Sequence, residues 1–162
     1  MTIHAHPHWV IDALKLANEV AQHAKNEGHH PFGALLLAPD QRTVLDQQGN
    51  IDTVNHAEST LARRAYERFD PAYLWQCTLV TTVEPCAMCS GTQYWAHIGR
   101  LVYGLSERQL LDLTGNHEQN PTMNLSSREV FAAGQKTIEV IGPVLEMQGE
   151  LIQLHLGFWG RG

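Results

Sequence analysis

The sequence predicts an α/β fold, a three-layer α/β/α sandwich in which a mixed sheet of about five strands lies between helical layers. Predicted helices and strands alternate through the middle of the chain, which favours parallel strands joined by helical crossovers. Near the start, two strands follow one another across a short turn and add an antiparallel edge. The 162 residues, 43% of them hydrophobic, suffice for one domain over residues 1–162.

The first half of the chain begins with an amphipathic helix, because apolar residues recur at helical spacing over residues 8–27. An apolar run at 34–38 predicts a strand, and the turn residues at 39–41 connect it to a second strand at about 43–47. A helix at about 56–68 follows the loop that ends this hairpin.

The second half contains the strand expected to lie deepest in the sheet. Residues 76–83 are β-branched and apolar on both faces, which is typical of a strand covered on both sides. Pro85 ends this strand, a helix is expected at about 86–96, and a short strand at 100–104.

The remaining residues are predicted to form a long loop, a strand and a helix. The polar stretch 114–127 is longer than most connections in compact domains, and such loops are more often functional than idle. We expect residues 114–124 to form a rim or lid over a pocket. Residues 137–141 are the last predicted strand, and 144–156 the last helix.

Charge and hydropathy limit the classes of partner. The net charge is −6 and no segment concentrates Lys and Arg, which disfavours long nucleic acid as a ligand. The longest apolar stretches are far shorter than the ~20 residues that span a bilayer. The N-terminus also lacks the basic and apolar pattern of a secretory signal. We therefore expect a soluble, cytoplasmic protein with a small-molecule partner and no membrane contact.

Two short motifs carry the chemistry. His56-Ala57-Glu58 begins one predicted helix, and Pro85-Cys86-Ala87-Met88-Cys89 begins another. A structural zinc site built from thiolates needs a second Cys-x-x-Cys, which the chain lacks. One His and two Cys leave a tetrahedral Zn²⁺ one ligand short, and a catalytic zinc holds in that position a water whose pKa is about 7.

The placement of both motifs at helix N-termini fits this interpretation. The positive end of the helix dipole favours thiolate over thiol, so Cys86 and Cys89 are predisposed to bind a metal. Glu58 is close enough to reach a metal-bound water without becoming a ligand. We expect it to take a proton as zinc-bound hydroxide attacks an amino-bearing carbon, and to deliver it to the departing ammonia.

Together, His-x-Glu and Pro-Cys-x-x-Cys form the motif pair of zinc deaminases. The chain resembles the cytidine deaminase-like superfamily over roughly residues 31–104. The resemblance implies an α/β/α sandwich, His56, Cys86 and Cys89 as zinc ligands, and Glu58 as proton shuttle. The segments 31–34, 84–91 and 94–96 are similar to guanine deaminases, within the nucleobase deaminase branch. The resemblance also suggests a homodimer packed through the helices after the Cys motif.

Five further residues are candidate substrate contacts. Phe32 and Trp95 correspond to site-lining aromatic residues in guanine deaminase-like enzymes, and a planar base gains from stacking on such rings. The amide of Asn50 suits the edge of a base, and Ala57 lies between the ligand His and the carboxylate. Glu84 has two open interpretations, since it either receives an exocyclic amine or holds backbone groups near the metal.

The predicted function is a zinc-dependent hydrolase of C–N bonds in cyclic amidines, acting on a free guanine-, cytosine- or triazine-like ring. A tRNA adenosine deaminase is the alternative within the same class, but it needs a basic surface for phosphates, which the acidic composition disfavours. A catalytically silent, zinc-stabilised interaction protein is the alternative outside the class. Glu58 argues against it, because such a protein has little use for a carboxylate at the metal water.

Overall fold

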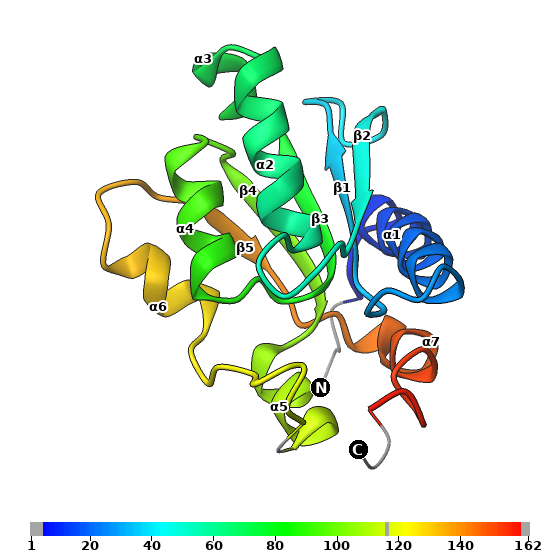
Figure 1. The fold of residues 1–162 in the computed structure, drawn as a ribbon. Coiled ribbons are helices and arrows are strands. Elements are labelled where there is room, and N and C mark those ends of the chain that lie inside the picture. The colour runs from blue at the N-terminus through cyan, green and yellow to red at the C-terminus, as the bar shows by residue number, and fades with distance from the viewer. Residues whose placement is uncertain (1–4, 116, 160–162) are drawn as a thin grey trace.

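The computed structural model describes residues 5–115 and 117–159. Their strands form one five-stranded sheet of order β2-β1-β3-β4-β5 (Figure 1). β1 (Gly33–Leu37) pairs antiparallel with both β2 (Val44–Gly49) and β3 (Thr78–Val83). β3, β4 (Arg100–Leu105) and β5 (Glu139–Ile141) run parallel. The sheet is therefore mixed, with the predicted hairpin at one edge, and the predicted fold class is confirmed.

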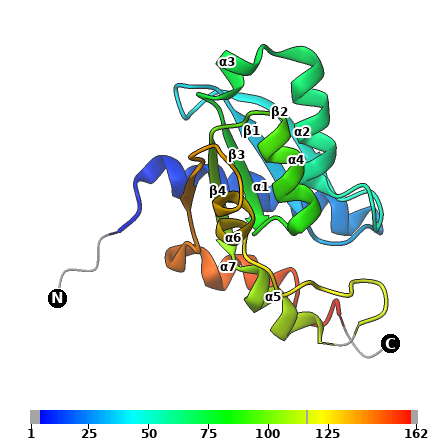
Figure 2. The same ribbon diagram turned by 90° about the vertical axis from the view of Figure 1, so that its left-hand side faces the viewer.

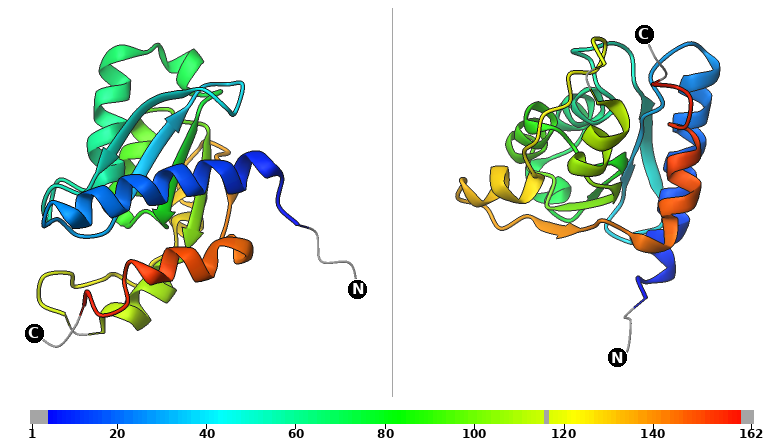
Figure 3. Two further views of the ribbon diagram at one scale, coloured as in Figure 1. Left: turned by 90° about the vertical axis from the view of Figure 1, so that its right-hand side faces the viewer. Right: turned by 90° about the horizontal axis from the view of Figure 1, so that it is seen from below.

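Helices cover both faces of this sheet (Figures 2 and 3). One face carries α1 (His8–Asn26), the 3-10 turn η1 (Leu145–Met147) and α7 (Gln148–Gln153). The other carries α2 (Ala57–Arg68), the short α3 (Pro71–Leu74), α4 (Ala87–Trp95) and α6 (Ser127–Ala132). Over residues 5–115 and 117–159, no helix is long and apolar enough to cross a membrane.

Two apolar cores follow from the alternation of side chains along the strands. Leu36 of β1 and Leu79 of β3 point to the α2 and α4 side, where they pack with residues such as Leu61. Their sequence neighbours, Leu35 and Val80, point to the α1 and α7 side. Because both faces are covered, every residue of β1 and β3 is buried, as the apolar run at residues 76–83 predicted for β3.

The structure departs from the predicted elements after β4. An unpredicted helix, α5 (Glu107–Thr114), lies at the carboxyl ends of β3 and β4, and begins with a capping box between Ser106 and Gln109 (Figure 1). The helix α6 was not predicted either; it begins at Ser127, with Ser126 as its cap, where the predicted long loop ends. The last helix is likewise shorter than the predicted 144–156 and divides into η1 and α7.

Candidate active site

Three metal-ligating side chains meet where α2 and α4 begin. His56 and Cys86 are the N-cap residues of these two helices, and Cys89 lies in the first turn of α4. The Nδ1 atom of His56 lies 3.6 Å from Sγ of Cys86 and 3.5 Å from Sγ of Cys89. The two sulfur atoms are 3.7 Å apart. The fold thus brings together residues that are 30 positions apart in the chain.

These spacings fit zinc. With Zn–N of about 2.1 Å and Zn–S of about 2.3 Å, tetrahedral geometry separates the N and S ligands by about 3.6 Å and two S ligands by about 3.8 Å. The other ring nitrogen of His56, Nε2, lies 2.9 Å from the Thr53 carbonyl, and this bond orients Nδ1 toward the thiols. His56, Cys86 and Cys89 are therefore positioned to bind one metal ion.

The electrostatics of the site favour a thiolate before any metal binds. The hydrogen bond with Cys89, followed by the one with His56, holds the pKa of Cys86 well below that of an ordinary thiol. The N-terminus of α4 adds positive potential at the same sulfur atom. These groups therefore favour the thiolate form of Cys86, which is the form that binds a metal.

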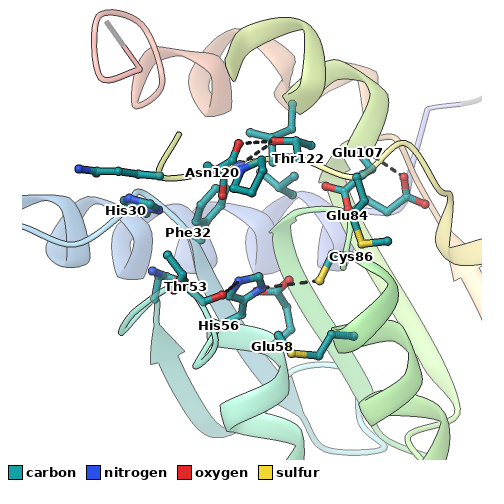
Figure 4. A pocket seen from close by; sticks show the side chains of 17 residues that line it. His30, Phe32, Thr53, His56, Glu58, Glu84, Cys86, Glu107, Asn120 and Thr122 are labelled. Carbon is teal, nitrogen blue, oxygen red and sulfur yellow. Dashed lines mark hydrogen bonds between the residues drawn. The ribbon is translucent and has the colours of Figure 1, made fainter. Parts of the chain in front are cut away.

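Glu58 is the second residue of α2, two positions beyond the N-cap His56, with only 7% of its surface exposed. Burial, followed by the nearby charge of Cys86, raises the pKa of Glu58 to about 7. A carboxyl group with a pKa near the operating pH both accepts and releases protons readily. Glu58, His56 and Cys86 line the same pocket (Figure 4), so the carboxyl group is beside the place where substrate meets the metal.

The pocket has a volume of about 270 Å³. Typical drug-sized ligands occupy pockets of roughly 300–1,000 Å³, so this one suits a single small heterocycle. Its wall contains the carboxyl groups of Glu58, Glu84 and Glu107 and no Lys or Arg side chain among the described residues. The electrostatics of the pocket therefore disfavour a phosphate group.

Three of the five predicted substrate contacts line this pocket, namely Phe32, Asn50 and Glu84. Ala57 is fully buried behind the wall and does not line it. The structure places Trp95 outside the pocket of its own chain, on the outer side of α4, with 73% of its surface exposed. The reason is helical geometry: six residues beyond Cys89, the helix has advanced about 9 Å and presents another side.

The hydrogen bonds of Glu84 show that it holds backbone groups near the metal site, the second of its two predicted roles. Its Oε1 accepts a hydrogen bond from the backbone N–H of Glu107, at 2.9 Å. Its Oε2 accepts two from Ser127, one from the backbone N–H at 2.8 Å and one from the hydroxyl at 2.6 Å. Glu84 therefore holds the N-termini of α5 and α6 beside the metal site, and both of its oxygens are already engaged.

Several lining residues were not predicted. They include Glu107 and Leu110 of α5, His30 and Thr53, Val83 and Met88, and a loop segment over the pocket that contains Gln119, Asn120, Pro121, Thr122 and Met123. The loop segment lies where the sequence led us to expect a rim. The Ser-x-x-Gln capping box at Ser106 was the available signal for α5. Because β3 and β4 are parallel neighbours, whatever follows β4 lies beside the Cys motif.

A small pocket, three zinc ligands that leave the fourth coordination position open, and a buried carboxyl group beside them define a zinc-dependent hydrolytic deaminase. The sequence model of the family described as "Cytidine and deoxycytidylate deaminase zinc-binding region" matches residues 7–105, and the chain belongs to this family. Within it, the chain is a nucleobase deaminase.

Three relatives show how far the similarity extends. The chain is 36% identical to a probable cytosine deaminase of Schizosaccharomyces pombe over 92% of this chain and 91% of that protein. It is 33% identical to a tRNA-specific adenosine deaminase of Haemophilus influenzae, over 58% of this chain and 57% of that one. The structure of guanine deaminase from Nitrosomonas europaea superposes with a TM-score of 0.69 at 20% identity, covering 99% of this chain and 88% of that one. The last comparison supports the fold.

Proposed function

We propose that this chain deaminates a free nucleobase with one ring, and that cytosine is the first candidate. The observation that carries the proposal is the small pocket in which the metal ligands and Glu58 meet. Its volume suits a base without sugar or phosphate, and its three carboxyl groups disfavour nucleotides. The full-length similarity to a probable cytosine deaminase supports a pyrimidine over a purine.

The proposed reaction converts a ring carbon bearing an amino group, with one water, into a ring carbonyl and ammonia. His56, Cys86 and Cys89 would hold zinc, which when bound lowers the pKa of water so that hydroxide is available at neutral pH. Glu58 accepts one proton released by the water and delivers it to the ring nitrogen. It then takes the proton of the new hydroxyl group and delivers it to the amine, so that the C–N bond breaks as the C=O bond forms and ammonia leaves neutral. Phe32 and Asn50 hold the ring, Phe32 through its face and Asn50 through its amide.

A tRNA adenosine deaminase is the second candidate, because a relative with that activity matches 58% of the chain. Binding an anticodon arm relies on phosphate contacts with Lys and Arg. The net charge of −6 and a pocket wall without such side chains among the described residues both oppose this alternative.

The decisive experiment is an ammonia-release screen of the zinc-loaded protein. Its panel contains cytosine, guanine, adenine, an aminotriazine, cytidine and a tRNA anticodon stem-loop, with Glu58→Gln as the inactive control. We expect release from cytosine and little from cytidine. Release from guanine alone would replace the proposed base, activity on the stem-loop alone would establish the second candidate, and no release from any compound would reject the function.

We also propose that the chain acts as a homodimer in the cytoplasm, where reducing conditions keep Cys86 and Cys89 available to a metal. The outer sides of α2 and α4 expose two large aromatic residues, Tyr66 at 53% and Trp95 at 73%. Such side chains are enriched at protein interfaces. Sedimentation analysis should give a dimer for the native chain and a shift toward monomer for Trp95→Glu. A native monomer would reject the homodimer.

A further inference from the structure

Glu107 is a buried carboxyl group inside the pocket without a partner for one of its oxygens. Only 4% of its surface is exposed, and among the described residues nothing donates a hydrogen bond to its Oε2. A buried polar atom in this condition costs free energy, and such atoms in native structures call for an explanation. A ligand that donates a hydrogen bond would provide one.

The position of Glu107 is fixed by the backbone. As the first residue of α5 its N–H donates to Glu84, and this bond ties it to the end of the strand that precedes Cys86. Figure 4 shows Glu107 and Glu84 on the same side of the pocket as Cys86. The unpartnered oxygen is thus on the metal side of the pocket, where the attacked carbon and its amino group must lie.

The charge environment of Glu107 strengthens the case. Burial, followed by the nearby charges of Cys86 and Glu58, raises the pKa of Glu107 to about 9. Its neighbours therefore contribute negative potential to this corner of the pocket. With this pKa Glu107 is a neutral carboxylic acid at neutral pH, and its carbonyl oxygen accepts a hydrogen bond from an N–H donor, whose positive hydrogens also suit the charges of Cys86 and Glu58.

We infer that Oε2 of Glu107 accepts a hydrogen bond from the exocyclic amine of the substrate, and that Glu107 is a specificity-determining residue for the leaving group. This inference rests on the proposed function. The bond orients the amine at the attacked carbon while Glu58 moves the protons, and it persists as the amine becomes ammonia. Glu107 itself neither gains nor loses a proton in this step. Rings that carry an amine are thereby favoured over the same rings without one.

The test compares two ligands that differ only in the amine. Zinc-loaded Glu58→Gln protein binds without turnover, and calorimetry gives the Kd of cytosine and of pyrimidin-2-one, which has hydrogen in place of the amine. If the screen identifies guanine, the pair is guanine and hypoxanthine. Adding Glu107→Leu should weaken binding of the amine-bearing ligand roughly 10- to 100-fold and that of its partner less than about 3-fold. Asp112→Leu, on the exposed side of the same helix, should change neither.

Glu107→Gln keeps the size of the side chain and one acceptor oxygen, so it guards against misfolding of the leucine variant. We expect it to weaken binding of the amine-bearing ligand about 3- to 10-fold and to leave the other ligand unaffected. Equal weakening of both ligands would assign Glu107 a structural role and overturn the inference, as would unchanged binding of both. Inactivity of the native chain on every compound in the screen would instead reject the proposed function.

Discussion

Oε2 of Glu84 accepts two hydrogen bonds from Ser127, from its backbone N–H at 2.8 Å and from its hydroxyl at 2.6 Å. Residues 43 positions apart are thereby joined, and the end of β3 is fixed to the beginning of α6. Because Pro85 and Cys86 follow directly, this contact also fixes the position of a metal ligand.

Replacing Glu84 should therefore destabilise the protein. Glu84→Ala leaves the Ser127 and Glu107 N–H groups without their buried acceptor, and we expect the free energy of unfolding to fall by about 3 kcal/mol or more. Ser127→Ala removes only the hydroxyl contact and should cost about 1–2 kcal/mol. Urea unfolding measures both, with the exposed Glu129→Ala as control. A loss of activity at unchanged stability would contradict this structural role.

Glu58→Gln should separate metal binding from turnover. The amide has nearly the same shape but cannot shuttle protons, so ammonia release should fall roughly 10²- to 10⁴-fold. Zinc content should stay at about one per chain, because Glu58 is not a ligand. Metal analysis and single-turnover ammonia assays on one sample give both values. Undiminished turnover in this variant would rule out the proton-transfer role of Glu58.

Removal of a ligand should abolish metal binding. Cys89→Ser and His56→Ala should each lose zinc and ammonia release together, and a chelator should do the same to the native protein, reversibly on addition of zinc. The metal-free protein should also melt at lower temperature, because a ligand that binds only the folded state stabilises it. Cys77→Ala is the matched control, since this buried cysteine packs in the core beneath α2 and should leave zinc content unchanged. Full zinc content in Cys89→Ser would contradict the site.

Stability should fall in mild acid because of His155. Burial, followed by the nearby charge of Lys25, lowers the pKa of His155 to about 4, while its Nδ1 accepts a hydrogen bond from Nε1 of Trp159 at 2.9 Å. In the unfolded chain the pKa is about 6.5, so the unfolded state binds more protons between the two values. The stability associated with neutral His155 is thus complete above about pH 6.5 and declines as pH falls toward 4, by roughly 3 kcal/mol at most.

A variant that cannot titrate at position 155 tests this pH effect. His155→Gln keeps an acceptor for Trp159 but does not titrate, so the stability difference between the native chain and this variant should shrink as pH falls from 7 to 4.5. Urea unfolding at several pH values, followed by tryptophan fluorescence, gives that difference. Trp159 also packs against His30 and Phe32 of the pocket wall, at ring-centroid distances of 4.8 and 5.9 Å. Protonation of His155 should therefore also weaken the packing of this wall. A difference that stays constant with pH would exclude His155 as the cause.

The sequence alone determined the class of protein and most of its architecture. The helix and strand pattern predicted a mixed sheet between helices, and two motifs predicted His56, Cys86, Cys89 and Glu58 as the reactive set. Such signals are local, because ligand type, spacing and helix starts are readable within a few residues. The helix at Glu107–Thr114 escaped prediction even though its capping box was readable in the same way.

Only the tertiary structure decided which other side chains surround the reactive set. Glu84 became a structural acceptor because the fold brings Ser127 to it, and Trp95 lies outside the pocket because α4 turns it away. The sequence also could not predict that Oε2 of Glu107 lacks a hydrogen-bond donor among the described residues, because this depends on every segment packed around it. Burial and hydrogen-bond satisfaction arise from contacts between residues distant in the chain, and no local pattern encodes them.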